Sequence, residues 1–107
     1  MDDILARLHV THEQIAAFCL KWQIVRLELF GSVLRDDFDE ESDIDVLVTF
    51  AADAKWRFAD LIDMEDALKA MFCRDVDLVE RPLVEQSPNW IRRRAILESA
   101  TPVYASA

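Results

Sequence analysis

Leu29-Phe30-Gly31-Ser32, followed after ten residues by Asp43-Ile44-Asp45, is the stretch that decides how this chain folds. Ile, Val, Leu and Phe are frequent before and within it, so we predict one strand over residues 24–30 and a second over residues 43–50. Gly31 is the only glycine of the chain. Because glycine lacks a Cβ, its backbone can turn sharply and bring an amide close to a ligand. The segment therefore predicts two strands connected through a tight turn.

Gly31 and Ser32 together predict an anion-binding turn. Ser32 adds a hydroxyl group and can begin a helix, whose free backbone amides and positive dipole end face the same anion. The chain that follows Phe30 thus offers neutral hydrogen-bond donors to a phosphate group.

Asp43 and Asp45 lie two residues apart on the second predicted strand, so their carboxylates project from one face with Cα atoms roughly 7 Å apart. Hard divalent ions such as Mg²⁺ take one or two carboxylates together with phosphate oxygens. Two such ions can activate an attacking oxygen and stabilise a leaving one. No lysine or arginine lies within this strand to pair with the aspartates, which favours a metal site.

Asp77 is the third candidate carboxylate, in a short predicted strand over residues 76–80. If this strand lies beside the second one, Asp77 joins Asp43 and Asp45. There it can share a metal and help to deprotonate an incoming hydroxyl group. The alternative is a surface residue without a catalytic role.

The composition limits the classes of function. The 107 residues carry a formal net charge of −9, which disfavours binding to nucleic acid or anionic membranes, since both need a basic surface. No apolar run approaches the roughly 20 residues of a membrane span, and the acidic N-terminus lacks the basic and apolar regions of a signal peptide. We therefore expect one cytoplasmic domain over residues 1–107, with neither nucleic acid nor membrane as a partner.

The rest of the sequence predicts helices around a small sheet. From periodicity and capping patterns we predict the following further elements: helices that begin at Thr11, Trp56 and Asn89, and a last strand or extended tail over residues 101–104. The interspersed elements indicate an α/β (α+β) fold, with a mixed sheet and helices packed mainly on one face. Cys19 and Cys73 fall in apolar helical patterns, so we expect two buried free thiols.

Residues 29–35 and 42–48 closely resemble the minimal nucleotidyltransferases (MNT) of the DNA polymerase beta superfamily. Val76-Asp77-Leu78-Val79 looks like the strand that carries the third carboxylate in that family, and residues 90–104 are similar to its last helix and short tail. The resemblance covers nearly the whole chain. It implies a mixed-sheet palm that uses two Mg²⁺ ions and transfers AMP from ATP.

The match implies a role for each motif residue: Gly31 and Ser32 bind the triphosphate, and Asp43, Asp45 and Asp77 hold the metals. Arg35 falls beside the triphosphate, although it is equally able to pair with Asp37 or Asp39. The family often has glycine after this arginine, where the present chain has Asp36. That departure bears on the shape of the loop and leaves the anion-binding turn intact.

The palm takes up almost all of the chain, so little is left to form a pocket for the acceptor. Stand-alone proteins of this type resemble the antitoxins of HEPN/MNT (type VII) toxin–antitoxin pairs. The resemblance implies that the chain adds AMP to a tyrosine of a HEPN-type toxin, as a homodimer or in a hetero-oligomer. Two alternatives stay open: an antitoxin that neutralises its toxin by binding alone, and a small-molecule adenylyltransferase of the antibiotic-modifying kind.

Arg92, Arg93 and Arg94 form the only basic run. On a helix they spread over about 200°, so they cannot all face one ligand. We interpret them as a solvated face that balances the acidic residues, with a docking patch for a partner as the alternative.

Overall fold

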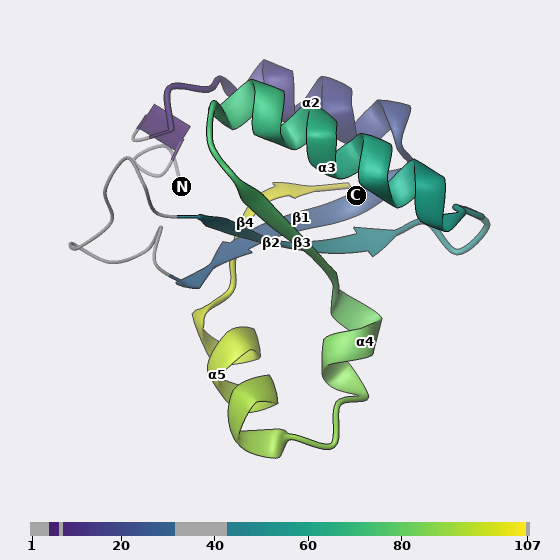
Figure 1. The fold of residues 1–107 in the computed structure, drawn as a ribbon, viewed down its shortest axis with the longest axis vertical. Coiled ribbons are helices and arrows are strands. Elements are labelled where there is room, and N and C mark those ends of the chain that lie inside the picture. The colour runs from purple at the N-terminus through teal and green to yellow at the C-terminus, as the bar shows by residue number, and fades with distance from the viewer. Residues whose placement is uncertain (1–4, 7, 32–42, 107) are drawn as a thin grey trace.

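A four-stranded mixed sheet forms the centre of the computed structural model, which describes residues 5–6, 8–31 and 43–106 (Figure 1). The strands are β1 (Ile24–Phe30), β2 (Ile44–Phe50), β3 (Val76–Glu80) and β4 (Thr101–Ala105), in the spatial order β3-β2-β1-β4. β1 runs antiparallel to β2 and β4, and β2 runs parallel to β3. The predicted mixed sheet is confirmed, and the last strand lies at an edge, where its proline costs no ladder hydrogen bond in the interior of the sheet.

The strand register decides which side chains share a face. Phe30 lies opposite Asp45, and Asp45 lies opposite Asp77. One step along the same face, Leu47 lies opposite Val79. Because directly opposed residues project to the same side, these five side chains belong to one face of the sheet.

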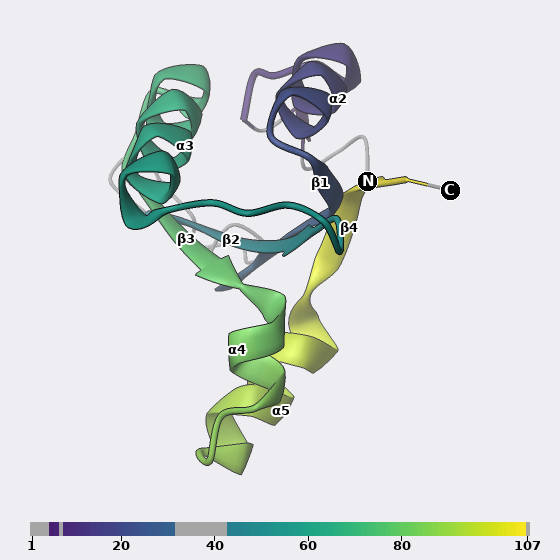
Figure 2. The same cartoon turned by 90° about the vertical axis from the view of Figure 1, so that its right-hand side faces the viewer.

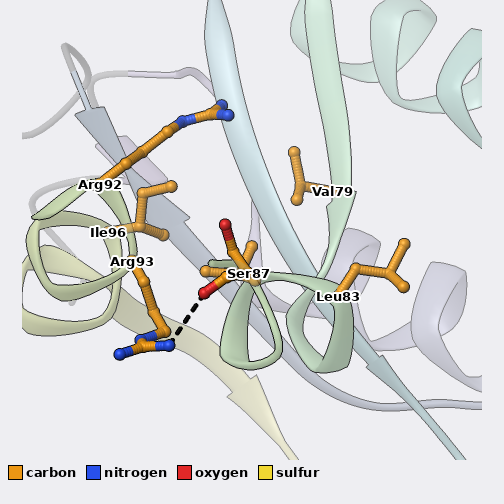
Figure 3. A pocket seen from close by; sticks show the side chains of 7 residues that line it. Val79, Leu83, Ser87, Arg92, Arg93 and Ile96 are labelled. Atoms are coloured by element: carbon orange, nitrogen blue, oxygen red, sulfur yellow. Dashed lines mark hydrogen bonds between the residues drawn. The ribbon is translucent and has the colours of Figure 1, made fainter. Parts of the chain in front are cut away.

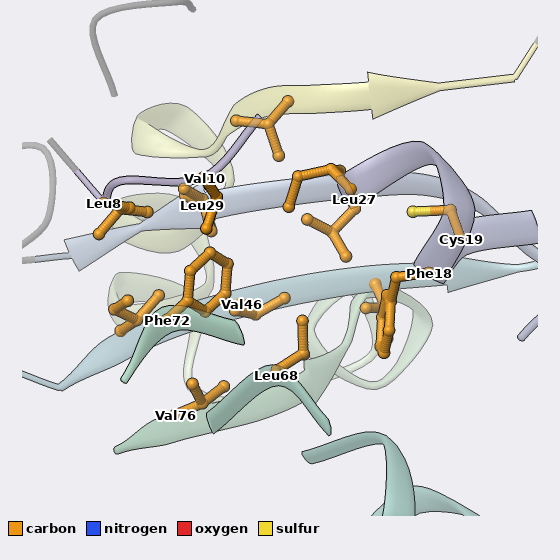
Figure 4. Close-up of a cluster of buried hydrophobic side chains, with 14 of the residues drawn as sticks. Leu8, Val10, Phe18, Cys19, Leu27, Leu29, Val46, Leu68, Phe72 and Val76 are labelled. Atoms are coloured by element: carbon orange, nitrogen blue, oxygen red, sulfur yellow. The ribbon is translucent and has the colours of Figure 1, made fainter. Parts of the chain in front are cut away.

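The other face is covered by α2 (His12–Lys21) and α3 (Phe58–Phe72), which lie side by side above the strands (Figures 1 and 2). The N-terminus of α2 has the predicted capping box, in which Thr11 Oγ1 accepts from the backbone N–H of Gln14 at 3.1 Å. Figure 4 shows the apolar core between these helices and the sheet, to which the following labelled residues contribute: Phe18, Leu27, Leu29, Val46, Leu68, Phe72 and Val76.

Only one of the two predicted buried thiols is buried. Cys19 lies in the core under α2, whereas Cys73 is exposed. Cys73 follows the last residue of α3 with φ +58°, so the helix has already ended and the chain turns away from the core.

Two further helices, α4 (Arg81–Glu85) and α5 (Trp90–Ser99), lie on the opposite side of the sheet from α2 and α3 (Figure 2). Phe30 and Leu47 of the sheet pack there against Val84 and Ile96. We expected helices mainly on one face; α2 and α3 follow that expectation, and α4 and α5 form a second layer. Within the described ranges, no helix is long and apolar enough to cross a membrane.

α4 begins where we expected only the end of a strand, so the sequence pattern did not predict this helix. Pro82 lies in the first turn of α4, where the missing N–H removes no helical hydrogen bond. We expected the last helix to begin at Asn89, and α5 begins one residue later, at Trp90. Asn89 is the cap instead, because its side-chain oxygen accepts from the backbone N–H of Arg92 at 3.1 Å.

Candidate functional site

The tight turn after β1 lies directly beside a carboxylate. Gly31 follows the last residue of β1 with φ +79°, a conformation that other residues rarely adopt. A Cβ atom built at Gly31 would overlap Asp45 Oδ2 and lie 3.3 Å from Asp45 Cγ. Glycine is therefore required here twice, by its own backbone conformation and by the closeness of the Asp45 side chain. A ligand held by this turn would lie next to Asp45.

Asp77 lies on the strand next to Asp45. The two residues are in direct register between parallel strands, which are separated by about 4.8 Å, and they share the face that carries Phe30. Asp77 is exposed and Asp45 is half-buried, so both are within reach of a ligand from solution. The second and third predicted strands are adjacent in the sheet, as expected.

Asp43 lies just before β2 and is exposed. The strand pairing begins immediately after it, since the backbone N–H of Ile44 donates to the carbonyl of Asp75 at 2.9 Å. Alternation along the chain places Asp43 on the side of Asp45. Within the described ranges, no three Asp, Glu, His or Cys side chains converge closely enough to enclose a metal ion as they stand.

The donor atoms of this face fit a hard divalent cation. Asp45 and Asp77 supply carboxylate oxygens from adjacent strands. Mg²⁺ binds through one or two carboxylates and completes its shell with water and phosphate oxygens, so it does not need a closed cage of protein ligands. The pair therefore suits an ion that arrives together with a phosphorylated ligand. The predicted site residues Ser32 and Arg35 lie outside the described residues.

The same face carries a buried acid that we did not predict from the sequence. Glu28 of β1 is only 2% exposed, and its Oε1 accepts from Arg81 Nη1 at 2.6 Å and from Arg26 Nε at 3.1 Å. Because Arg81 begins α4, the ion pair ties that helix to β1 across β2. The sequence pattern that could have indicated this ion pair is an acid, Glu28, between two leucines of a strand. Arg26, two residues earlier, lies on the same side of that strand.

A cavity of about 170 Å³ lies farther along this face, between β3, α4 and α5 (Figure 3). Val79, two residues after Asp77 on the same side of β3, forms part of its wall. Arg93 Nη1 donates to the carbonyl of Ser87 at 2.9 Å, while Arg92 extends toward the strands.

The third arginine of the basic run points elsewhere. Arg94 pairs with Glu98 at 2.9 Å on the exposed side of α5. Arg92 and Arg93 line the cavity between α4 and α5 and Arg94 does not, so the three side chains do not all face one ligand, as the helical spacing predicted.

Comparison with known proteins gives a consistent picture. The family model for the nucleotidyltransferase domain matches residues 12–103. A solved protein described as a minimal nucleotidyltransferase is 30% identical, with a TM-score of 0.68, and the similarity covers 92% of this chain and 94% of that chain. No curated protein is detectably similar in sequence.

Two complexes share the fold at lower sequence identity. A toxin–antitoxin complex solved with AMP-PNP is 19% identical, with a TM-score of 0.67, over 91% of this chain and 75% of that chain. The complex of a tri-AMPylated HEPN toxin of Shewanella oneidensis with an MNT antitoxin is 20% identical, with a TM-score of 0.59, over 89% and 70%.

Proposed function

The chain belongs to the nucleotidyltransferase domain family, and we propose that it transfers AMP from ATP to a tyrosine hydroxyl of a HEPN-type toxin as the antitoxin of the pair. The observation that carries this proposal is the arrangement of Gly31, Asp45 and Asp77. Gly31, in a backbone conformation that other residues rarely adopt, lies against one carboxylate, and a second carboxylate lies in register beside the first. Triphosphate and divalent cation can therefore be bound at the same place.

The positions of Gly31, Asp43, Asp45 and Asp77 allow a role for each, and the role of Ser32 is the one that the family resemblance implies. The backbone at Gly31 approaches the triphosphate, with Ser32 as the second donor of the turn. Asp45 and Asp77 would hold the cation, with Asp43 as the third ligand that the family resemblance implies; when bound, the cation would neutralise the phosphate oxygens and lower the pKa of a coordinated hydroxyl group. The acidic surface makes this cation necessary, because a triphosphate would otherwise be repelled by the net charge of −9.

The transfer itself is an in-line displacement. The hydroxyl oxygen of the acceptor attacks the α-phosphorus of ATP, the bond from that phosphorus to the oxygen bridging the β-phosphate breaks, and pyrophosphate leaves. Asp77, as the exposed carboxylate of the pair, accepts the proton of the attacking hydroxyl group. The products are an AMP ester of the acceptor, pyrophosphate and one proton.

The choice of nucleotide and acceptor is supported by the two toxin–antitoxin complexes that share the fold. One of them contains AMP-PNP, and in the other the HEPN toxin is tri-AMPylated.

The test is to incubate the chain, ATP and Mg²⁺ with its candidate partner, the HEPN-type protein that we expect the adjacent gene to encode, and to measure the intact mass of that protein. We expect mass increases of whole AMP units on a tyrosine, and none with Asp45→Asn. Asp53→Asn is the matched control, because it removes the same charge from an exposed loop at the other end of β2. Neutralisation of the toxin without any mass increase, retained by Asp45→Asn, would contradict the transfer and favour an antitoxin that acts by binding alone.

A further inference from the structure

A groove of about 360 Å³ lies along the outer side of β3, between α3 and α4. β3 is an edge strand of the described sheet, with β2 as its neighbour. Figure 2 shows α3 on one side of β3 and α4 on the other. The groove is separate from the cavity between α4 and α5, although Val79 and Leu83 contribute to both.

One stripe of α3 forms the upper wall of this groove. The lining residues of α3 follow the helical spacing i, i+3, i+4 and i+7: Phe58, Leu61, Ile62 and Glu65. Such a stripe is the usual contact surface between two packed helices. Among the residues that the structure describes, no helix packs against this stripe, since α2, the neighbouring helix on that face, lies on the other side of α3 (Figure 2).

The apolar side chains around the groove are unusually exposed. Phe58 is 77% exposed, Ile62 46% and Leu83 62%. Single exposed apolar residues are common on protein surfaces, but these three come from two helices and meet at one groove. Together they form a contiguous apolar surface that a partner could cover.

The charges at this groove are acidic. Glu65 and Glu80 are the charged residues that line it. α3 as a whole carries four acidic residues and a single lysine, Lys69, which lies 3.4 Å from Glu65. Arg81, the base nearest to Glu80 in the sequence, points onto the sheet face and is bound to Glu28. The groove therefore favours an occupant with positive charge.

We propose that this groove is the docking site for an amphipathic helix of the partner protein, whose apolar stripe covers Phe58, Ile62 and Leu83 and whose lysine or arginine residues face Glu65 and Glu80. A second copy of the chain is a poorer occupant, because its net charge of −9 would bring acid against acid. The inference rests on the proposed function, since it identifies where the protein that receives AMP is held.

The position of the groove explains how docking would serve transfer. Leu78 and Val79 line the groove and directly follow Asp77 on β3. At about 3.3 Å per residue along a strand, the partner surface would lie within roughly one or two residue lengths of the candidate base. A hydroxyl group next to the docked helix could then reach the site from the open edge of the sheet.

The experiment measures binding and transfer separately, using the full chain and the purified HEPN-type protein that we expect the adjacent gene to encode. In Ile62→Ser/Leu83→Ser we expect a dissociation constant at least roughly 30-fold higher than in the wild type, because two of the three exposed apolar anchors are lost. Leu20→Ser is the matched control, since this leucine is 73% exposed on α2 and lies outside the groove. All of these residues are exposed, so thermal melting followed by circular dichroism should show unchanged folding.

Two further variants separate docking from catalysis. Asp45→Asn should bind the partner as the wild type does and transfer no AMP. Glu80→Gln should weaken binding and reduce its dependence on salt concentration. If the groove variant binds as tightly as the wild type, the docking site is wrong while the proposed function stands. If the wild type itself does not bind the HEPN-type protein, both proposals are wrong.

Discussion

Replacing Gly31 with alanine would disturb the candidate site at its tightest point. The added Cβ would overlap Asp45 Oδ2, and the φ of +79° would be retained by a residue that disfavours it. The backbone cost is about 1–2 kcal/mol for a non-glycine residue in the left-handed region. Relief of the overlap by moving the carboxylate or the strand costs about 1–3 kcal/mol more, as for other overpacked positions. We therefore expect Gly31→Ala to lower the free energy of unfolding by roughly 2–5 kcal/mol.

The overlap can be separated from the backbone cost by a double-mutant cycle. In an Asp45→Ala background the carboxylate is gone, and the nearest remaining atom of the side chain, Cβ, would lie 3.6 Å from the new methyl group, an ordinary contact. Only the backbone cost of about 1–2 kcal/mol should then remain. The coupling between the two positions should accordingly be about 1–3 kcal/mol, which is above the scatter of independent sites.

Urea unfolding of the four proteins measures this coupling directly. In the same series, AMP transfer by Gly31→Ala should fall by about 100-fold, since displacing a catalytic group by roughly 1 Å has an effect of this size. Additive losses in the cycle, within about 0.5 kcal/mol, would show that Gly31 does not lie against the Asp45 carboxylate. Wild-type activity in Gly31→Ala would likewise refute the role assigned to the turn.

Three further predictions follow from the same structure. Asp77→Asn should abolish AMP transfer. The free energy of unfolding should stay within about 0.5 kcal/mol of the wild type, because the side chain is exposed. Transfer near the wild-type rate would rule out the role of Asp77 as the base. Arg81→Met should lower the free energy of unfolding by about 1–3 kcal/mol, since it removes the 2.6 Å hydrogen bond to the buried carboxylate of Glu28. An unchanged urea midpoint would show that this ion pair does not stabilise the packing of α4 against β1. Burial raises the pKa of the Cys19 thiol to about 12, so iodoacetamide at mildly alkaline pH should label Cys73 alone in the folded protein, and mass spectrometry showing equal labelling of both thiols would contradict that burial.

Local sequence patterns were sufficient for the parts of the fold that depend on local physics. β1 and β3 have the predicted bounds. Each is a run of mostly β-branched and other apolar residues, and each run ends where residues that favour a turn or a helix begin. The capping box at Thr11 was predicted correctly for the same reason, since both partners lie within one helical turn. The adjacency of Asp45 and Asp77 depended on the strand order, which the sequence could only suggest.

The second helical layer was not predicted, because it depends on contacts between residues far apart in the chain. β1 buries residues on both faces, and so does β2. The poor alternation of these strands was therefore a sign that a second layer covers them, as strands buried on both faces read as continuous apolar runs. The bond between Glu28 and Arg81 spans 53 residues, and no local rule brings two such positions together.

The position of the transferred phosphorus tests the central claim most directly. The chain and the HEPN-type protein should be incubated with Mg²⁺ and ATP that carries a radioactive label either in the α-phosphate or in the γ-phosphate. Transfer of AMP predicts that the α-label reaches the partner, that the γ-label leaves with pyrophosphate, and that Asp45→Asn and a chelator each abolish the incorporation. Incorporation of the γ-label would contradict a nucleotidyl transfer. Incorporation of the α-label that Asp45→Asn leaves unchanged would contradict a transfer at the site where Gly31 lies beside the carboxylates.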